Sequence, residues 1–226
     1  MVTSGHQGDG TRELLLRAAA EEILGTGYAG ASLSAIAARR NVTKGALAYH
    51  YPAKSDIAAA LLERQAATLQ ALLAASQARY PQCGVRQLID FLYNVVSVHL
   101  ADPLMAAGNS IAFGPAVPGL PATGGVAWWQ HTYQEMFDAA LQVGERSAGV
   151  PSGTAALTLT SMLIGGADMV RVIPQPAIDL DVAMSMVGVV LAGCGVSNAS
   201  TLIGEVVAHA GEAAGRQAAG DFTATE

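Results

Sequence analysis

The sequence predicts an all-α fold, with a three-helix head that contains a helix-turn-helix and a helical bundle behind it. Ala and Leu dominate, and aromatic residues are only 5% of the chain, too few for a strand-rich fold. Apolar residues, 51% of the 226, recur at helical spacing. Charged residues are 13%, against the roughly 25% typical of soluble domains. This deficit indicates extensive buried surface, including a subunit interface.

The first helix is expected from Thr11 to about Leu24, where Thr11 can cap its amino end and Gly25 and Gly27 can stop it. The residues before it, 1–10, have no basic segment followed by an apolar one. They therefore predict a disordered arm and no signal peptide.

Two short helices with a three-residue turn follow. Ser32 can cap a helix over 33–39, and Thr43 can cap one that reaches about residue 50. Asn41, in the turn between them, tolerates the left-handed backbone nearly as well as glycine. This spacing satisfies a helix-turn-helix, but it equally satisfies an ordinary surface hairpin of helices.

If the motif binds DNA, the amino end of its second helix leads into the major groove. That end carries a hydroxyl and a positive charge, and two residues with almost no side chain allow the backbone to approach closely. These residues are Thr43, Lys44, Gly45 and Ala46.

The rest of the chain also reads as helical. Pro52 stands near the start of a fourth helix, expected over 53–76, where its missing N–H costs nothing. A glycine- and proline-rich segment, 102–125, predicts a long loop, and 218–226 predicts a flexible tail. Further helices are expected over 85–101, 126–144, 152–173, 180–192 and 199–217.

The charge distribution permits local contact with nucleic acid although the net charge is −6. Residues 1–65 hold seven of the twelve Lys and Arg, against six acidic residues. The uncharged run 182–204 is interrupted by serines, an asparagine and glycines, so we expect no membrane span. The two cysteines, Cys83 and Cys194, predict neither a disulfide framework nor a metal site, which fits a cytoplasmic protein.

No enzymatic motif is present. The nucleophile pattern G-x-S-x-G, the phosphate loop and H-E-x-x-H are all missing, and the histidines of the second half lie in unrelated segments. We therefore expect neither catalysis nor a cofactor or metal.

The run from Arg12 to Leu61 resembles the DNA-binding head of the TetR family of transcriptional regulators. The resemblance implies a head over 11–58 and an all-helical ligand-binding and dimerisation domain over 59–217. It implies DNA contacts by Thr43, Lys44, Gly45, Tyr49, His50 and Lys54. The matching residues are Arg12, Leu15, Ala18, Ala19, Gly27, Tyr28, Ser32, Leu33, Ile36, Ala37, Val42, Thr43, Lys44, Gly45, Leu47, Tyr49, His50, Tyr51, Lys54 and Ile57.

Several head residues keep two interpretations. Ala48 stands where the family usually has a tyrosine, so one backbone contact is missing. His50 is at least as often a packing residue as a DNA contact in this family. Arg39 and Arg40 can bind phosphate or lie at a solvated helix end, and Tyr51 is expected in the core.

The second half predicts a small-molecule site rather than a catalytic one. Trp129 and Tyr133 lie one helical turn apart, which suits an apolar effector pocket but equally suits plain core packing. With Gly144 and Glu145 downstream, this stretch is similar to the γ-butyrolactone-receptor branch of the TetR family. The similarity implies that Trp129 is the pocket tryptophan.

Polar contacts to the effector are harder to place. Gln65 can bind a lactone or hydroxyl group, or face solvent. The branch usually has Phe-Thr-Gly where this chain has Leu163, Ile164 and Gly165, so a pocket hydroxyl is missing unless Thr160 or Ser161 supplies it. This departure leaves room for an effector other than a butyrolactone.

Together these features predict a homodimeric repressor that binds a pseudo-palindromic operator and is released by a small apolar signal. Its two half-sites would lie in major grooves about 34 Å apart, or a multiple of that. The signal would be a γ-butyrolactone-type autoregulator or an antibiotic. The alternatives are a drug-responsive repressor of an efflux gene and a helical small-molecule-binding protein that never touches DNA.

Overall fold

A computed structural model describes residues 4–82, 84–120, 125–172 and 178–210. The chain divides into two compact units, and helices α4 and α5 contribute to both. Unit 1 comprises Met1–Ala71 and Val98–Val126, and unit 2 comprises Leu72–Ser97 and Ala127–Glu226. This division differs from the expected boundary at residue 58, because a later segment of the chain joins the head in unit 1.

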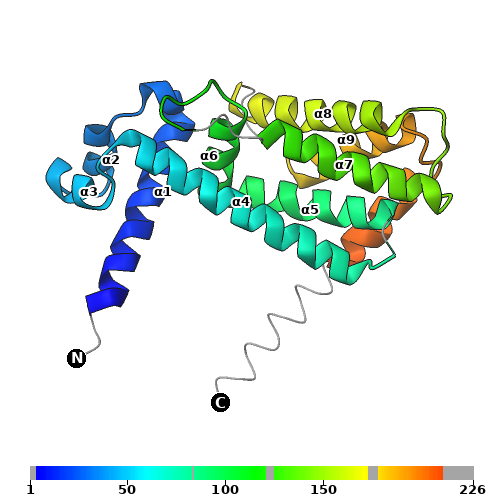
Figure 1. Ribbon diagram of the computed structural model, residues 1–226, viewed down its shortest axis with the longest axis horizontal. Coiled ribbons are helices and arrows are strands. Elements are labelled where there is room, and N and C mark those ends of the chain that lie inside the picture. Colours follow the sequence, from blue (N-terminus) through cyan, green and yellow to red (C-terminus); the bar gives the residue numbers. More distant parts are fainter. Residues whose placement is uncertain (1–3, 83, 121–124, 173–177, 211–226) are drawn as a thin grey trace, which may run out of the picture. The chain divides into compact units, whose positions relative to one another are not determined.

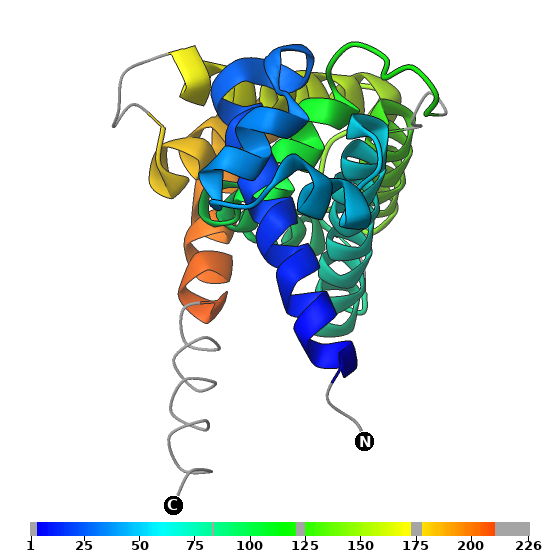
Figure 2. The ribbon, with the colours of Figure 1, turned by 90° about the vertical axis from the view of Figure 1, so that its left-hand side faces the viewer.

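Unit 1 is built around a long first helix. Helix α2 packs against α1, and α3 packs against α2 (Figure 2). Helix α6 also lies against α1 (Figure 1). The elements are α1 (Ser4–Gly30), α2 (Leu33–Arg39), α3 (Lys44–His50), the first part of α4 (Lys54–Arg79) and α6 (Pro103–Ala112).

One apolar cluster holds unit 1 together. Ile23 of α1, Ile36 of α2, Leu47 of α3 and Leu61 of α4 are all fully buried, and Ile111 of α6 is nearly so. Burying each such side chain stabilises a fold by about 1.5–3 kcal/mol. Each helix of the head is therefore fixed by this shared core.

The first helix is longer than the sequence predicts. It begins at Ser4, inside the segment 1–10 that was expected to be a disordered arm, so Thr11 does not cap it. Extending a formed helix is far easier than starting one, which lets α1 include these weak helix formers. Gly27 interrupts it with a φ of 74°, a backbone that favours glycine, and the chain resumes as a last turn to Gly30.

The expected loop over 102–125 is wrong in its first half, which forms α6. Asp102 caps this helix by accepting a hydrogen bond from the Leu104 N–H at 3.1 Å, and Pro103 occupies its first turn. Apolar residues of α6 then pack into the core of unit 1. The glycines and prolines that suggested a loop fall mainly after the helix.

Unit 2 is a helical bundle formed by the end of α4 and five further helices. Helices α8 and α9 pack together, and Asp90 of α5 accepts hydrogen bonds from Ser76 and Arg79 of α4. The further elements are α5 (Val85–Ala101), α7 (Gly125–Gln142), α8 (Ser152–Val172), α9 (Leu180–Gly193) and a helix over 199–210 (Figure 1). The flexible tail expected at 218–226 lies outside the described residues.

Two adjacent charged residues tie the loops of unit 2. Glu145 accepts a hydrogen bond from the Val85 N–H at 2.6 Å, which caps the start of α5. Arg146 is buried, and its guanidinium donates to the carbonyls of Phe137, Val150 and Cys194 and to the Ser152 hydroxyl. One side chain thus satisfies four acceptors from three segments of the chain.

Within the described ranges, no helix combines the length and apolar character needed to cross a lipid bilayer.

We expect Arg146→Met to lower the free energy of unfolding by more than about 3 kcal/mol, because several buried acceptors lose their donor at about 1–3 kcal/mol each. Urea unfolding followed by circular dichroism measures this. Arg86→Met is the control, since the ion pair of Arg86 with Glu205 is exposed and such pairs contribute about 0–1 kcal/mol. Equal losses in the two variants would contradict the assignment.

Candidate nucleic-acid interface and effector site

The amino end of α3 is capped as the sequence predicts. The Thr43 hydroxyl accepts a hydrogen bond from the Ala46 N–H at 3.1 Å, and Asn41 adopts a φ of 53° in the turn before it. Leu47 and Tyr51 are buried beneath the helix. The cap and these two anchors fix the orientation of a helix only seven residues long.

The residues proposed to lead into DNA are open to solvent. Thr43, Lys44, Gly45 and Ala46 are all exposed. Lys44 makes no ion pair with any described residue, and a Cβ on Gly45 would meet nothing closer than the Thr43 hydroxyl at 3.9 Å. The fold itself therefore does not require glycine there, which leaves that surface free for a close partner.

Tyr49 continues this open surface, with 85% of its area exposed. Its ring meets the half-buried His50 edge-on, at 5.1 Å between centroids. Tyr51 is buried and donates a hydrogen bond to the Arg12 carbonyl at 3.4 Å, which confirms its expected place in the core.

Lys54 has a structural task that the sequence did not indicate. Its ammonium group donates to the carbonyls of Tyr28, Ala29 and Ala31 at 2.8–3.3 Å and lies 4.5 Å from the centre of the Tyr28 ring. An ammonium has only three donors. These contacts fasten α4 to the connection between α1 and α2, and they compete with the expected phosphate contact by Lys54.

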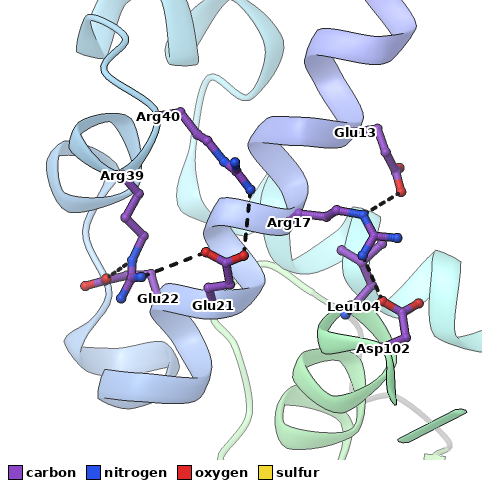
Figure 3. A network of polar contacts seen from close by, with 8 residues as sticks. All are labelled: Glu13, Arg17, Glu21, Glu22, Arg39, Arg40, Asp102 and Leu104. Atoms are coloured by element: carbon purple, nitrogen blue, oxygen red, sulfur yellow. Dashed lines mark hydrogen bonds and ion pairs between the residues drawn. The ribbon is translucent and has the colours of Figure 1, made fainter. Parts of the chain in front are cut away.

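The two arginines at the end of α2 also have partners inside the head (Figure 3). Arg39 Nε lies 2.7 Å from Glu22 Oε2, and Arg40 Nη2 lies 3.7 Å from Glu21 Oε1. Arg39 also lies 3.9 Å from Glu21. Neither arginine is a free solvated end, and both side chains extend towards α1.

An aromatic cluster in unit 2 contains the predicted pocket tryptophan. Trp129 is 5.4 Å from Tyr133 and 5.9 Å from Phe91 of α5, measured between ring centroids. Trp128 completes the cluster at 5.2 Å from Trp129. Trp129 and Tyr133 thus share a face of α7, as their spacing predicts.

The Tyr133 hydroxyl is the unusual atom of this cluster. Tyr133 is fully buried, and among the described residues its hydroxyl has no hydrogen-bond partner. An unsatisfied buried hydroxyl costs about 1–3 kcal/mol. Burial also raises the pKa of Tyr133 well above its usual value, so the group stays protonated and can donate.

Gln65 lies in unit 1, in a chain of buried polar groups. Its amide donates to Asn109 of α6, and the Asn109 amide lies 3.0 Å from His99 Nδ1. Gly108 permits this contact, because a Cβ there would lie 2.8 Å from the Gln65 Cβ. Gln65 is therefore buried, which rules out the solvent-facing alternative, and its amide already has a protein partner.

The two candidates on α8 differ from each other. Thr160 is buried, and its hydroxyl donates to the Ala156 carbonyl of its own helix at 2.8 Å. Ile164 is half-buried. Both belong with Trp129 and Tyr133 to unit 2, whereas Gln65 belongs to unit 1.

Sequence reasoning missed Phe91, Trp128, Asn109 and His99. Phe91 and Trp128 are single aromatics on expected helices, and spacing alone does not reveal a ring contact between helices. Asn109 lay in a segment read as loop. If 103–112 had been predicted as a helix, Asn109 would have been a candidate partner for a polar residue such as Gln65.

Burial lowers the pKa of His99 below its usual value, so the folded chain binds a proton there less readily than the unfolded chain. Above a pH of about 6.5 this group does not affect stability. As the pH falls below about 6.5 the free energy of unfolding decreases, by at most about 1.4 kcal/mol per unit, until the pH passes the folded pKa. Urea unfolding at several pH values should show that His99→Gln removes this loss. His131→Gln, at an exposed site, should not, and equal profiles for wild type and His99→Gln would refute it.

Comparison with known proteins supports this description of the head. Residues 15–61 match the model of the family "Bacterial regulatory proteins, tetR family". No curated protein matches the chain in a sequence search.

Solved structures with the same fold cover most of the chain. A γ-butyrolactone receptor described as ArpA-like is 24% identical with a TM-score of 0.73, and the match covers 88% of this chain and 98% of that one. CprB from Streptomyces coelicolor, in complex with its operator sequence, is 22% identical with a TM-score of 0.72, over 91% and 99% of the two chains. A structure concerned with bacterial hormones that control antibiotic production is 27% identical with a TM-score of 0.60, over 79% and 93%. Residues 15–61 are thus similar to the DNA-binding domain of the TetR family of bacterial regulatory proteins, and the chain as a whole has the fold of the solved γ-butyrolactone receptors.

Proposed function

We propose that this protein is a ligand-responsive transcriptional repressor that binds a pseudo-palindromic operator as a homodimer in the cytoplasm. A small apolar signal with a hydrogen-bond acceptor, such as a γ-butyrolactone-type autoregulator or an antibiotic, releases it from DNA. The observation that carries the proposal is the exposed amino end of α3, capped, rigidly anchored and free of internal ion pairs.

This helix end suits DNA in two ways. Its unpaired backbone N–H groups and the positive end of the helix dipole favour phosphate. Thr43, Lys44 and Tyr49 add two hydroxyls and one cation, while Gly45 and Ala46 leave room for the duplex. His50, half-buried against Tyr49, orients that ring and contacts DNA only at its edge.

Exposed apolar residues on α8 and α9 support the homodimer. Leu157 and Met169 of α8 and Val182 and Val189 of α9 are exposed, Val189 to 75%. Large apolar side chains at this exposure are typical of surfaces that a partner covers. A second copy of the chain is the partner that a pseudo-palindromic operator requires.

The aromatic cluster of α5 and α7 supports the effector site. Trp129 and Tyr133 supply apolar area, and the Tyr133 hydroxyl, which has no partner among the described residues, supplies a donor for a carbonyl oxygen of the effector. Ile164 and Thr160 provide further contacts from α8. The donor of Tyr133 replaces the hydroxyl that this chain lacks at Ile164.

The DNA-binding half of the proposal is tested by gel-shift titration with fragments that flank the protein's own gene. The wild type should bind one of them, and Lys44→Ala should weaken binding and reduce the slope of log affinity against log salt by about 0.9 per head. Arg86→Ala, an exposed cation of unit 2, should change neither quantity. If the wild type bound none of the fragments at low ionic strength, the proposal would be refuted.

For the effector site, Tyr133→Phe should raise the free energy of unfolding by about 1 kcal/mol, because it removes an unsatisfied buried hydroxyl. The same variant should respond less to a synthetic γ-butyrolactone, with little change for the matching tetrahydrofuran analogue that lacks the carbonyl. Thermal unfolding with and without each compound measures both effects. Tyr49→Phe is the control for stability, and a destabilised Tyr133→Phe would mean that the hydroxyl has a partner.

A further inference from the structure

Unit 1 carries no net charge in its sequence. Residues 1–71 and 98–126 contain seven Lys and Arg and seven Asp and Glu. DNA-binding heads obtain non-specific affinity from cations that neutralise phosphates and release counterions. In a neutral head, the contribution of each cation therefore depends on what it already contacts.

Four of these cations are paired with carboxylates. Arg17 lies 3.2 Å from Asp102, which ties α1 to α6 (Figure 3). Arg64 lies 3.5 Å from Glu13, which ties α4 to α1. Arg39 and Arg40 are paired with Glu22 and Glu21, as described above. Of the other three, Lys54 donates to carbonyls, and the exposed Arg12 lies over the Tyr51 ring without an ion pair. Lys44 is the exposed cation that makes neither an ion pair nor a ring contact among the described residues.

The location of Arg39 and Arg40 makes their pairing notable. They end α2, the helix of a helix-turn-helix that crosses the DNA backbone, where a cation would ordinarily meet phosphate. Figure 3 shows both side chains turned towards α1 instead.

Stability accounts for little of the Arg40–Glu21 pair, whereas Glu22, whose side chain is only 11% exposed, also stabilises the head through its pair with Arg39. The side chains of Arg39, Arg40 and Glu21 are 37–43% exposed, and exposed ion pairs contribute about 0–1 kcal/mol to folding. Their effect on DNA binding is larger, since an arginine that must leave a carboxylate to reach a phosphate gains little from the exchange.

We propose that Glu21 and Glu22 are specificity-determining positioning residues, which withhold Arg39 and Arg40 from phosphate and so suppress binding to non-operator DNA. This inference rests on the proposed function, because it concerns how a DNA-binding head discriminates. Sequence discrimination then depends on α3, and Lys44 supplies the main free charge of each head.

The test uses the full-length protein and a duplex of random sequence, followed by fluorescence anisotropy over a range of salt concentrations. Glu21→Gln removes the carboxylate that pairs with Arg40. The variant should therefore bind this duplex more tightly than the wild type. For a dimer it should also steepen the slope of log affinity against log salt by about 1.8, from about 0.9 for each released cation. Glu63→Gln is the matched control, because it removes one exposed acid of the same unit that pairs with no arginine among the described residues.

Two further variants complete the design. Glu21→Gln/Glu22→Gln should steepen the slope by up to about 3.6, since up to four arginines are released per dimer. Adding Arg40→Gln to Glu21→Gln should restore the wild-type slope, which a purely structural role of Glu21 does not predict. On operator DNA the variants should gain less affinity than on random DNA.

Unchanged slopes in both glutamate variants, or the same change in Glu63→Gln, would overturn the inference. Its failure differs from failure of the proposed function. A wild type that ignores operator fragments, with a double variant that binds random DNA at a steep salt slope, would refute the repressor and retain the role of the glutamates. If no form binds any duplex at low salt, both proposals fail.

Discussion

The structure depends on the burial of Leu47 and Tyr51 beneath α3. A helix of seven residues does not persist alone in water, because starting a helix costs more than a few hydrogen bonds return. Leu47 is fully buried and Tyr51 nearly so, in a core shared with α1, α4 and α6. That anchoring holds the cap at Thr43 and leaves the next three residues open to a partner.

A chain with so few charges uses them economically. Arg146 donates to three segments of unit 2 and pairs with no carboxylate among the described residues, and Lys54 fastens the head by donating to three carbonyls. Buried carbonyls need hydrogen-bond donors, and in these loops the cationic side chains supply the donors that backbone N–H groups supply within helices. The same economy limits how many cations remain for DNA.

The proposed effector site and the exposed amino end of α3 differ in the surroundings of their polar groups. At the amino end of α3 the polar groups are exposed and accessible to another molecule. At α7 the Tyr133 hydroxyl is buried and has no hydrogen-bond partner among the described residues. A ligand that pairs with this hydroxyl stabilises the conformation that binds it, in proportion to its concentration over its dissociation constant. The free energy lost by leaving the Tyr133 hydroxyl unpaired in the free protein would be recovered when a ligand pairs with it.

The sequence alone determined the helical class, the caps at Ser32 and Thr43, the left-handed Asn41 and the shared face of Trp129 and Tyr133. Each follows from local backbone chemistry or helical spacing, which need no knowledge of distant contacts. Tertiary structure decided that α6 forms, that Lys54 is a structural tie, that Gln65 meets Asn109, and that Arg39 and Arg40 pair with α1. These depend on groups brought together from helices far apart in the chain, and no periodicity encodes which carboxylate, carbonyl or ring a side chain will meet.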